Sequence, residues 1–304
     1  MAAPCLTRSP RPPGLAAVLV SLNVKQAGDL GLEGQATPHA ADILQPHEAV
    51  FLRSRMPDSL AFDPDPSLRW LFWLAHPDDE VAIAAWIHDR VAAGCAVGMA
   101  WSHRTPVRET EARAVADVLG VPEAQRWFLD APDGHAVDHL TSLAAEFARV
   151  GEAFRPDRVV VPAFEQGHLD HDAANFLANR TWPGRVREFP MYHCYTRRYQ
   201  TLNAYIGNGP GERREHSPDE RRLKIAVARS YPSQTLWRNV VWYERWWRLR
   251  GRPVGLAHRE LLRVQTHVDF RRPNLDEPHR SRVEASAPWR RWIAALDAFD
   301  LENE

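Results

Sequence analysis

Cysteine and lysine are both scarce in this chain of 304 residues. Its three cysteines, Cys5, Cys95 and Cys194, lie far apart in the sequence and form no CxxC pair. This spacing excludes a disulfide framework and a thiolate metal site, and it favours a reducing compartment. Lys25 and Lys224 are the only lysines, an arginine bias that indicates GC-rich codon usage. The sequence therefore predicts a cytoplasmic protein of bacterial origin.

The sequence also lacks an apolar run long enough to span a bilayer. The segment GLAAVLVSLNV at 14–24 follows two arginines, as a signal sequence would, but no small-residue cleavage site follows it. The net charge is −1, and the excess of arginine towards the C-terminus is mild, too mild to indicate nucleic-acid binding. We expect neither a membrane nor a nucleic acid as partner, and the oligomeric state stays open.

Apolar runs of strand length alternate with stretches of helical spacing from Arg69 onwards. Before that point, residues 1–65 are rich in Pro, Gly and Ala and show little periodicity, which predicts a poorly ordered leader and approach segment. The predicted strands are 69–75, 96–102, 126–130 and 158–164, and the predicted helices are 79–94, 106–120 and 136–154. This alternation predicts an α/β, three-layer Rossmann-like fold, with a mainly parallel sheet and helices on both faces.

The C-terminal part has a helical pattern. We expect a core at 66–240 and a helical extension at 241–304 that packs on it. The stretch WYERWWRLRGR at 242–252 mixes aromatic residues with arginines, which is also typical of a nucleic-acid or membrane patch. Because Trp242, Trp246 and Leu249 share one helical face, we favour an amphipathic helix that is packed by these residues and keeps its arginines in water.

Three acidic side chains and a histidine follow the first predicted strand, in the segment AHPDDEV at 75–81. Ligands of parallel sheets bind beyond the carboxyl ends of the strands, where the loops gather. An acid in this place can simply cap the next helix, but capping needs only one acid and no histidine. Glu80 suits such a helix start, or a position that orients neighbouring ligands.

A second polar cluster, GHLDHD at 167–172, follows the fourth predicted strand. His168 and His171 lie three residues apart, with Asp170 between them. The two clusters reach the same edge of the sheet and supply imidazoles and carboxylates, the ligand set of a catalytic zinc site with one position open to water. The sequence therefore predicts one Zn²⁺ per chain, or another divalent metal in its place.

These motifs resemble those of the LmbE-like, or PIG-L-like, N-acetylglucosamine deacetylases, which are zinc-dependent. A fixed six-residue string such as AHPDDE arises by chance on the order of once in 10⁵ chains of this size, and the downstream HxDH strengthens the signal. The resemblance extends over about residues 69–240 and implies that the core is a deacetylase domain. Weaker agreements are Arg108 with Glu111, the pair Asp133–Gly134, and YPSQ at 231–234 preceded by Lys224.

The resemblance implies roles for the residues of both motifs. His76, Asp79 and His171 become the zinc ligands, and Asp78 is left free as the general base that takes a proton from the attacking water. A protonated His168, held by Asp170, is expected to stabilise the tetrahedral oxyanion.

Three further residues are candidate substrate contacts. Arg108 either meets a substrate hydroxyl or phosphate, or forms a surface salt bridge with Glu111. Asp133 is a turn former before Gly134, and the resemblance makes it a contact to a sugar hydroxyl. His103 lies in the loop WSHRTP, where relatives carry a glycine-rich turn. It is either a substrate contact, an extra metal neighbour or a surface histidine.

The predicted function is removal of the N-acetyl group from a small molecule or glycoconjugate that contains N-acetylglucosamine, which yields acetate and a free amine. The alternatives are an amidase of a non-acetyl or non-sugar amide, of the thiol-conjugate type, and a catalytically silent sugar-binding protein. A dinucleotide-dependent enzyme would need glycines directly after the first strand. AHPDDE contains none, which argues against such an enzyme. The resemblance implies a small N-acetylated sugar as the partner.

Overall fold

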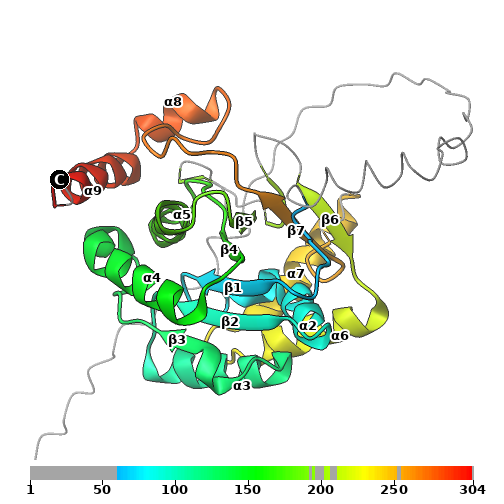
Figure 1. Cartoon of the computed structure of the whole chain (residues 1–304). Helices are drawn as coiled ribbons and strands as arrows, with labels where there is room; N and C mark the ends of the chain where they lie inside the picture. The colour runs from blue at the N-terminus through cyan, green and yellow to red at the C-terminus, as the bar shows by residue number, and fades with distance from the viewer. Residues whose placement is uncertain (1–59, 192–193, 196–201, 206–210, 252–254, 303–304) are drawn as a thin grey trace, which may run out of the picture. The chain divides into compact units, whose positions relative to one another are not determined.

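The computed structural model describes residues 60–191, 194–195, 202–205, 211–251 and 255–302. Most of the leader predicted at 1–65, and all of the signal-like segment at 14–24, lie outside these residues. Within the described residues, seven strands form one sheet in the order β3-β2-β1-β4-β5-β7-β6 (Figure 1).

The first five strands run parallel, whereas β7 is antiparallel to both β5 and β6. The strands are β1 (Arg69–Leu74), β2 (Ala96–Trp101), β3 (Arg126–Phe128), β4 (Arg158–Pro162), β5 (Val186–Phe189), β6 (Glu212–Glu215) and β7 (Arg259–Val264). The chain builds outward from β1 to β3 and then returns to place β4 on the other side of β1. Loops that leave β1 and β4 therefore flank the switch point where α/β sheets bind ligands. The mainly parallel sheet confirms the predicted α/β class.

Helices cover both faces of this sheet (Figure 1). The α-helices are α2 (Ala84–Ala92), α3 (Pro106–Leu119), α4 (Leu140–Phe154), α5 (Leu169–Thr181), α6 (Pro218–Arg229), α7 (Leu236–Leu249), α8 (His279–Glu284) and α9 (Ala287–Glu302). Short 3₁₀ helices are η3 (Asp79–Ala82), η4 (Glu123–Gln125) and η5 (Ala136–His139). The helix expected at 79–94 is split into η3 and α2, because Ile83 between them has φ −130° and ψ 19°, outside the helical region.

Successive side chains of β1 enter two different cores. Trp70, Phe72 and Leu74 pack with apolar residues of α2, α3 and α6. Leu71 and Trp73 point the other way and pack with α4, α5 and the C-terminal α9. All five side chains are fully buried, each worth roughly 1.5–3 kcal/mol of transfer free energy. RWLFWL shows no polar alternation because both faces of the strand are covered.

The structure corrects two expectations for the C-terminal part. It is mainly helical, but it also contributes β7, whose centre is buried and whose short apolar run has no period that distinguishes a strand from a helix. The expected packing of Trp242 and Leu249 is wrong, since they are 65% and 86% exposed. α7 instead turns Leu236 and Trp237 towards the core.

A buried carboxylate from β7 fixes the helix that follows the first motif. Glu260 is fully buried, and it accepts hydrogen bonds from the backbone N–H groups of Ala85 (2.8 Å) and Trp86 (3.0 Å). These donors lie at the N-terminus of α2, where the helix dipole favours negative charge. Lys224 Nζ lies 3.5 Å from Glu260 Oε1 and donates to the carbonyl of Ala82 at 3.0 Å. One buried ion pair thus holds η3 and α2 against β7.

We expect Glu260→Gln to lower the free energy of unfolding by about 3–5 kcal/mol, because it leaves the buried Lys224 charge uncompensated. Urea unfolding at neutral pH measures the loss. The matched control is Glu215→Gln, an exposed acid on β6, which should change stability by less than about 0.5 kcal/mol. Equal effects of the two substitutions would show that the Glu260 pair does not hold this region together.

Candidate active site

Carboxylates surround the imidazole of His76 in the loop after β1. His76 Nε2 lies 2.9 Å from Asp170 Oδ2 and 3.2 Å from Asp133 Oδ1, and Nδ1 lies 3.8 Å from Asp79 Oδ2. The backbone N–H of His76 also donates to Asp79 Oδ2 at 2.9 Å. His76, Asp79 and Asp170 are buried, whereas the side chain of Asp133 is 55% exposed. The acids of three separate loops therefore meet at one histidine.

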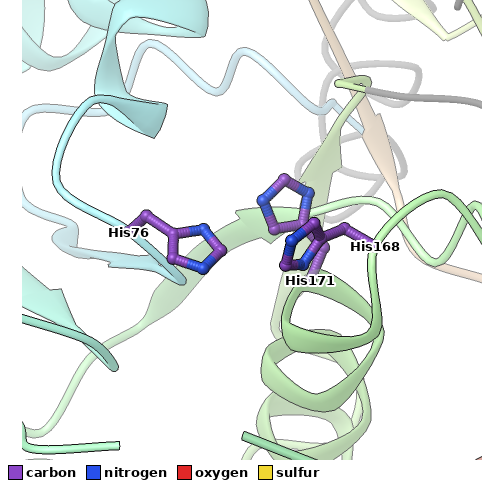
Figure 2. Close-up of side chains that lie close together, drawn as sticks. All are labelled: His76, His168 and His171. Atoms are coloured by element: carbon purple, nitrogen blue, oxygen red, sulfur yellow. The ribbon is translucent and has the colours of Figure 1, made fainter. Parts of the chain in front are cut away.

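The second motif brings two more imidazoles to the same place. His168 is the N-cap of α5, and its Nδ1 accepts a hydrogen bond from the backbone N–H of Asp170 at 3.2 Å. His171 lies one turn further on, with Nε2 3.4 Å from Asp79 Oδ1. Ring nitrogens of His76, His168 and His171 lie within 4.8 Å of one another. Figure 2 shows His76 reaching in from its loop towards the two histidines at the start of α5.

The raised pKa of His76 shows that the surrounding carboxylates stabilise a positive charge at this position. Burial lowers the pKa of His76, but its hydrogen bonds to Asp133 and Asp170 and the charge of Asp79 raise that pKa to about 10. The buried acids thus demand a positive charge, which the imidazolium supplies. A divalent cation among the same donors would displace that proton. Imidazole nitrogens and carboxylate oxygens at this spacing therefore fit a zinc-type ion.

The two adjacent aspartates differ in charge state. Burial, together with the charge of Asp79, raises the pKa of Asp78 to about 8, although Arg108 opposes the shift. Burial would also raise the pKa of Asp79, but His171 and His76 hold it well below its usual range. Neighbouring carboxylates with separated pKa values are typical of sites that divide acid–base work.

The backbone of Asp78 is strained. Its φ of 119° lies in the left-handed region that non-glycine residues rarely adopt. Arg108 Nη2 holds the residue by donating to Asp78 Oδ1 at 2.8 Å and to the carbonyl of Pro77 at 2.7 Å. The N–H of Asp78 donates to Glu80 Oε2 at 3.2 Å. Neighbouring side chains thus keep the Asp78 carboxylate in one position beside the histidines.

Glu80 faces away from the histidines and anchors the loop. It is fully buried, and it accepts hydrogen bonds from the hydroxyl of Tyr231 and from Trp101 Nε1, the latter at 3.4 Å. Burial raises the pKa of Glu80 to about 7. Nearby, Ser233 donates through its hydroxyl to Glu111 at 2.6 Å. The YPSQ segment therefore fixes both the loop and α3, and the alternative Arg108–Glu111 salt bridge is replaced by these contacts.

The three candidate substrate contacts gather around Asp133. Arg108 Nη1 lies 3.6 Å from Asp133 Oδ2, and His103 Nε2 lies 3.9 Å from the same oxygen. His103 is only 7% exposed, so it is not a surface histidine. Its Nδ1 lies 2.8 Å from the carbonyl of Ala131 and must carry the proton. Among the described residues, Nε2 has no hydrogen-bond partner.

The structure modifies the expectation for His168. Its Nδ1 lies 4.0 Å from Asp170 Oδ2, and the Asp170 carboxylate instead accepts from the N–H groups of Gly134 (2.7 Å) and Ala136 (2.9 Å). Burial and the charge of His171 lower the pKa of His168 to about 4. The ring is therefore neutral at pH 7, and because Nδ1 accepts a hydrogen bond its proton sits on Nε2. The sequence did not predict that the backbone N–H groups of Gly134 and Ala136 bind Asp170. The predicted turn at Asp133–Gly134 was the only indication that this loop lies near the site.

This cluster of acids and histidines suits a metal-dependent amide hydrolase, the class that the family comparison supports. Residues 71–182, from β1 to α5, match the family described as PIG-L: GlcNAc-PI de-N-acetylase. Both motifs fall inside this range. This match confirms the resemblance read from AHPDDE and HxDH.

Solved structures provide further, more distant similarities. A conserved protein of Thermus thermophilus is 22% identical, with 69% of this chain and 98% of that chain covered and a TM-score of 0.46. A deacetylase of the teicoplanin biosynthesis pathway is 19% identical, with coverages of 65% and 99% and a TM-score of 0.46. The N,N'-diacetylchitobiose deacetylase of Pyrococcus horikoshii is 18% identical, with coverages of 74% and 94% and a TM-score of 0.45. No curated protein matches the chain.

We expect Asp78→Asn to stabilise the metal-free protein by about 1–3 kcal/mol, because asparagine tolerates a positive φ better and carries no charge at this partly buried position. An acid whose folded-state pKa is raised destabilises the fold increasingly as pH rises from 3.8 towards about 8. The gain in melting temperature should therefore be larger at pH 8 than at pH 5.

The control for this pH dependence is Asp130→Asn. Asp130 is exposed, and the hydrogen bond from Arg104 lowers its pKa, so it is ionised at both pH values. Its substitution should change the melting temperature equally at pH 5 and pH 8. A destabilised Asp78→Asn protein, or one whose gain is greater at pH 5, would contradict the strained and partly buried state assigned to Asp78.

Proposed function

We propose that this hydrolase removes the N-acetyl group from a small molecule or glycoconjugate that contains N-acetylglucosamine, and that it uses one Zn²⁺ per chain. The deacetylase class follows from the family, whereas the sugar and the ion are our proposal. The observation that carries it is geometric. Three imidazoles and Asp79 meet at the sheet edge, and Arg108 clamps the carboxylate of Asp78, the residue directly before Asp79.

We assign His76, Asp79 and His171 as the residues that hold the ion, zinc or another divalent metal. Two imidazoles and one carboxylate are a common set for catalytic zinc with an open fourth position. When bound in such a set, zinc polarises a substrate carbonyl and lowers the pKa of water. His168 belongs to the same group of rings, so it is the alternative ligand.

Asp78 is the proposed general base. Its Oδ1 is held by Arg108, which leaves Oδ2 to take the proton of the water that attacks the amide carbonyl. The strained backbone and the hydrogen bond to Glu80 keep this oxygen oriented. Burial, which raises the pKa of Asp78 towards neutrality, also suits a residue that must accept a proton and later release it to the amine.

His168 is the proposed stabiliser of the tetrahedral oxyanion. A neutral ring with its proton on Nε2 donates one hydrogen bond, and it needs no charge of its own to do so. Asp170 acts by positioning. It ties the loop at Gly134 and Ala136 to the start of α5 and orients the ring of His76.

Arg108, Asp133 and His103 are the proposed contacts to the sugar. Asp133 accepts hydrogen bonds, Arg108 donates them, and His103 Nε2 has no partner among the described residues, so together they suit a ring that carries several hydroxyl groups. A simple non-sugar amide would leave the buried Nε2 of His103 unpaired, at a cost of about 1–3 kcal/mol. This row of polar groups favours a sugar over the alternative amidase substrates. A silent sugar-binding protein would have no use for the base Asp78.

We expect the purified protein to remove one acetyl group from members of a panel of N-acetylglucosaminides, as followed by mass spectrometry. Asp78→Asn should keep its zinc and lose about 10²- to 10⁴-fold in rate, whereas Asp79→Asn should lose zinc because an amide is a poorer ligand than a carboxylate. Wild-type rates in Asp78→Asn would remove the base role. Activity on other amides alone would favour the amidase alternative, and sugar binding without hydrolysis the silent one.

His168→Ala should retain zinc while losing about 10²- to 10³-fold in kcat, the usual effect of removing an oxyanion donor. His168→Gln should restore part of the rate, because its amide is a neutral donor. His139→Ala, which removes an exposed histidine of η5, is the control and should change neither quantity. Loss of zinc in His168→Ala would instead make His168 a ligand.

A further inference from the structure

The outward face of α7 carries a stripe of mixed apolar and basic side chains. Arg238, Trp242, Arg245 and Leu249 follow one another at intervals of four, three and four residues, so they share one helical face. All four are exposed, Trp242 by 65% and Leu249 by 86%. Arg248 is exposed beside them. A large aromatic and a large aliphatic side chain thus stand in water among three arginines.

The other side of α7 is attached to the protein, which fixes the stripe outward. The hydroxyl of Tyr243 accepts from the N–H of Leu202 at 3.2 Å, and Glu244 Oε1 accepts from the N–H of Ala257 at 2.6 Å. At its start, Trp237 packs against the core. The helix therefore cannot bury Trp242 and Leu249 by rolling over without breaking these contacts.

The charge on this face is positive throughout. Glu244 is the only acid of α7, and its side chain is engaged on the attached side by the N–H of Ala257 and lies 3.7 Å from His258 Nε2. The guanidinium of Arg245 lies 5.7 Å from the centre of the Trp242 ring. Arg250, directly after the helix, stacks on Trp246 at 4.3 Å. Within the part of the chain that the structure describes, none of these arginines has an acidic partner, so they add positive charge to the apolar stripe.

We propose that this face of α7 docks on an anionic lipid surface. Tryptophan rings prefer the headgroup level of a bilayer, an exposed leucine gains by entering the acyl boundary, and arginines pair with lipid phosphates. The charge complementarity selects anionic over neutral lipid. A nucleic acid would use the arginines but would give the isolated aliphatic Leu249 nothing to bind. No described helix has the length and apolarity to cross a bilayer.

This proposal is independent of the deacetylase function, and it reverses the expectation that a membrane is not a partner. That expectation assumed that Trp242 and Leu249 pack inside the protein, and the structure leaves them exposed. The two residues are the apolar centre of the surface, and Arg238, Arg245, Arg248 and Arg250 surround it.

The test is co-sedimentation of the full chain, loaded with zinc, with vesicles of phosphatidylcholine alone or mixed with phosphatidylglycerol. We expect binding to the anionic vesicles only, and weaker binding as salt is raised. Arg245→Gln with Arg248→Gln should weaken it by about 25-fold, roughly fivefold per arginine, and Trp242→Ser with Leu249→Ser should weaken it by at least tenfold. In the wild type, tryptophan fluorescence should shift to shorter wavelength on binding, and this shift should shrink in the Trp242→Ser variant.

Arg282→Gln is the matched control, since it removes an exposed arginine of α8 and the same charge elsewhere on the surface. It should bind like the wild type. Circular dichroism and melting temperature confirm that every variant is folded. The proposal is overturned if the wild type ignores anionic vesicles, if the α7 variants bind as well as Arg282→Gln does, or if the face retains an oligonucleotide rather than vesicles.

Discussion

An excess of carboxylates at one edge of the sheet is the constraint on which the rest of this site depends. Loops after β1 and β4 and the turn at Asp133 bring together Asp78, Asp79, Asp133 and Asp170 with His76, His168 and His171. Negative charge that is largely removed from water requires a compensating cation or donor. In the metal-free chain a protonated His76 is that cation, with Arg108 beside Asp78. The same need for positive charge makes the cluster suitable for a divalent metal.

Keeping so much charge in place requires support from distant parts of the chain. Glu260 on β7 holds the start of α2, and Tyr231 and Ser233 hold Glu80 and Glu111. These residues lie beyond the range that matches the family. They do no chemistry in our account, but they hold the loop and α3, from which Arg108 fixes the carboxylate of the strained Asp78. The part of the chain after residue 182 therefore supports the site, although none of the predicted ligands comes from it.

Local sequence patterns predicted much of this arrangement, because apolar runs and motif spacing are local properties. The parallel strands from β1 to β4 and the meeting of the AHPDDE and HLDH loops followed from them. Long-range contacts decided what could not be predicted. The strand β7 was missed because RELLRV has no clear period, and its Glu260 reaches a helix 175 residues earlier. The neutral state of His168 depends on its burial and on the nearby His171. The exposure of Trp242 depends on which face of α7 packs against the core.

The measurement that tests the central claim most directly is calorimetric titration of zinc into the metal-free protein at pH 8, repeated in buffers of different ionisation enthalpy. The heat difference between buffers counts the protons released on binding. Our account predicts one tightly bound ion per chain and release of about one proton or more, because His76 must give up the proton that its raised pKa of about 10 retains. Weak or absent binding, or tight binding without proton release, would contradict the claim that this cluster of carboxylates binds a divalent metal in exchange for the proton of His76.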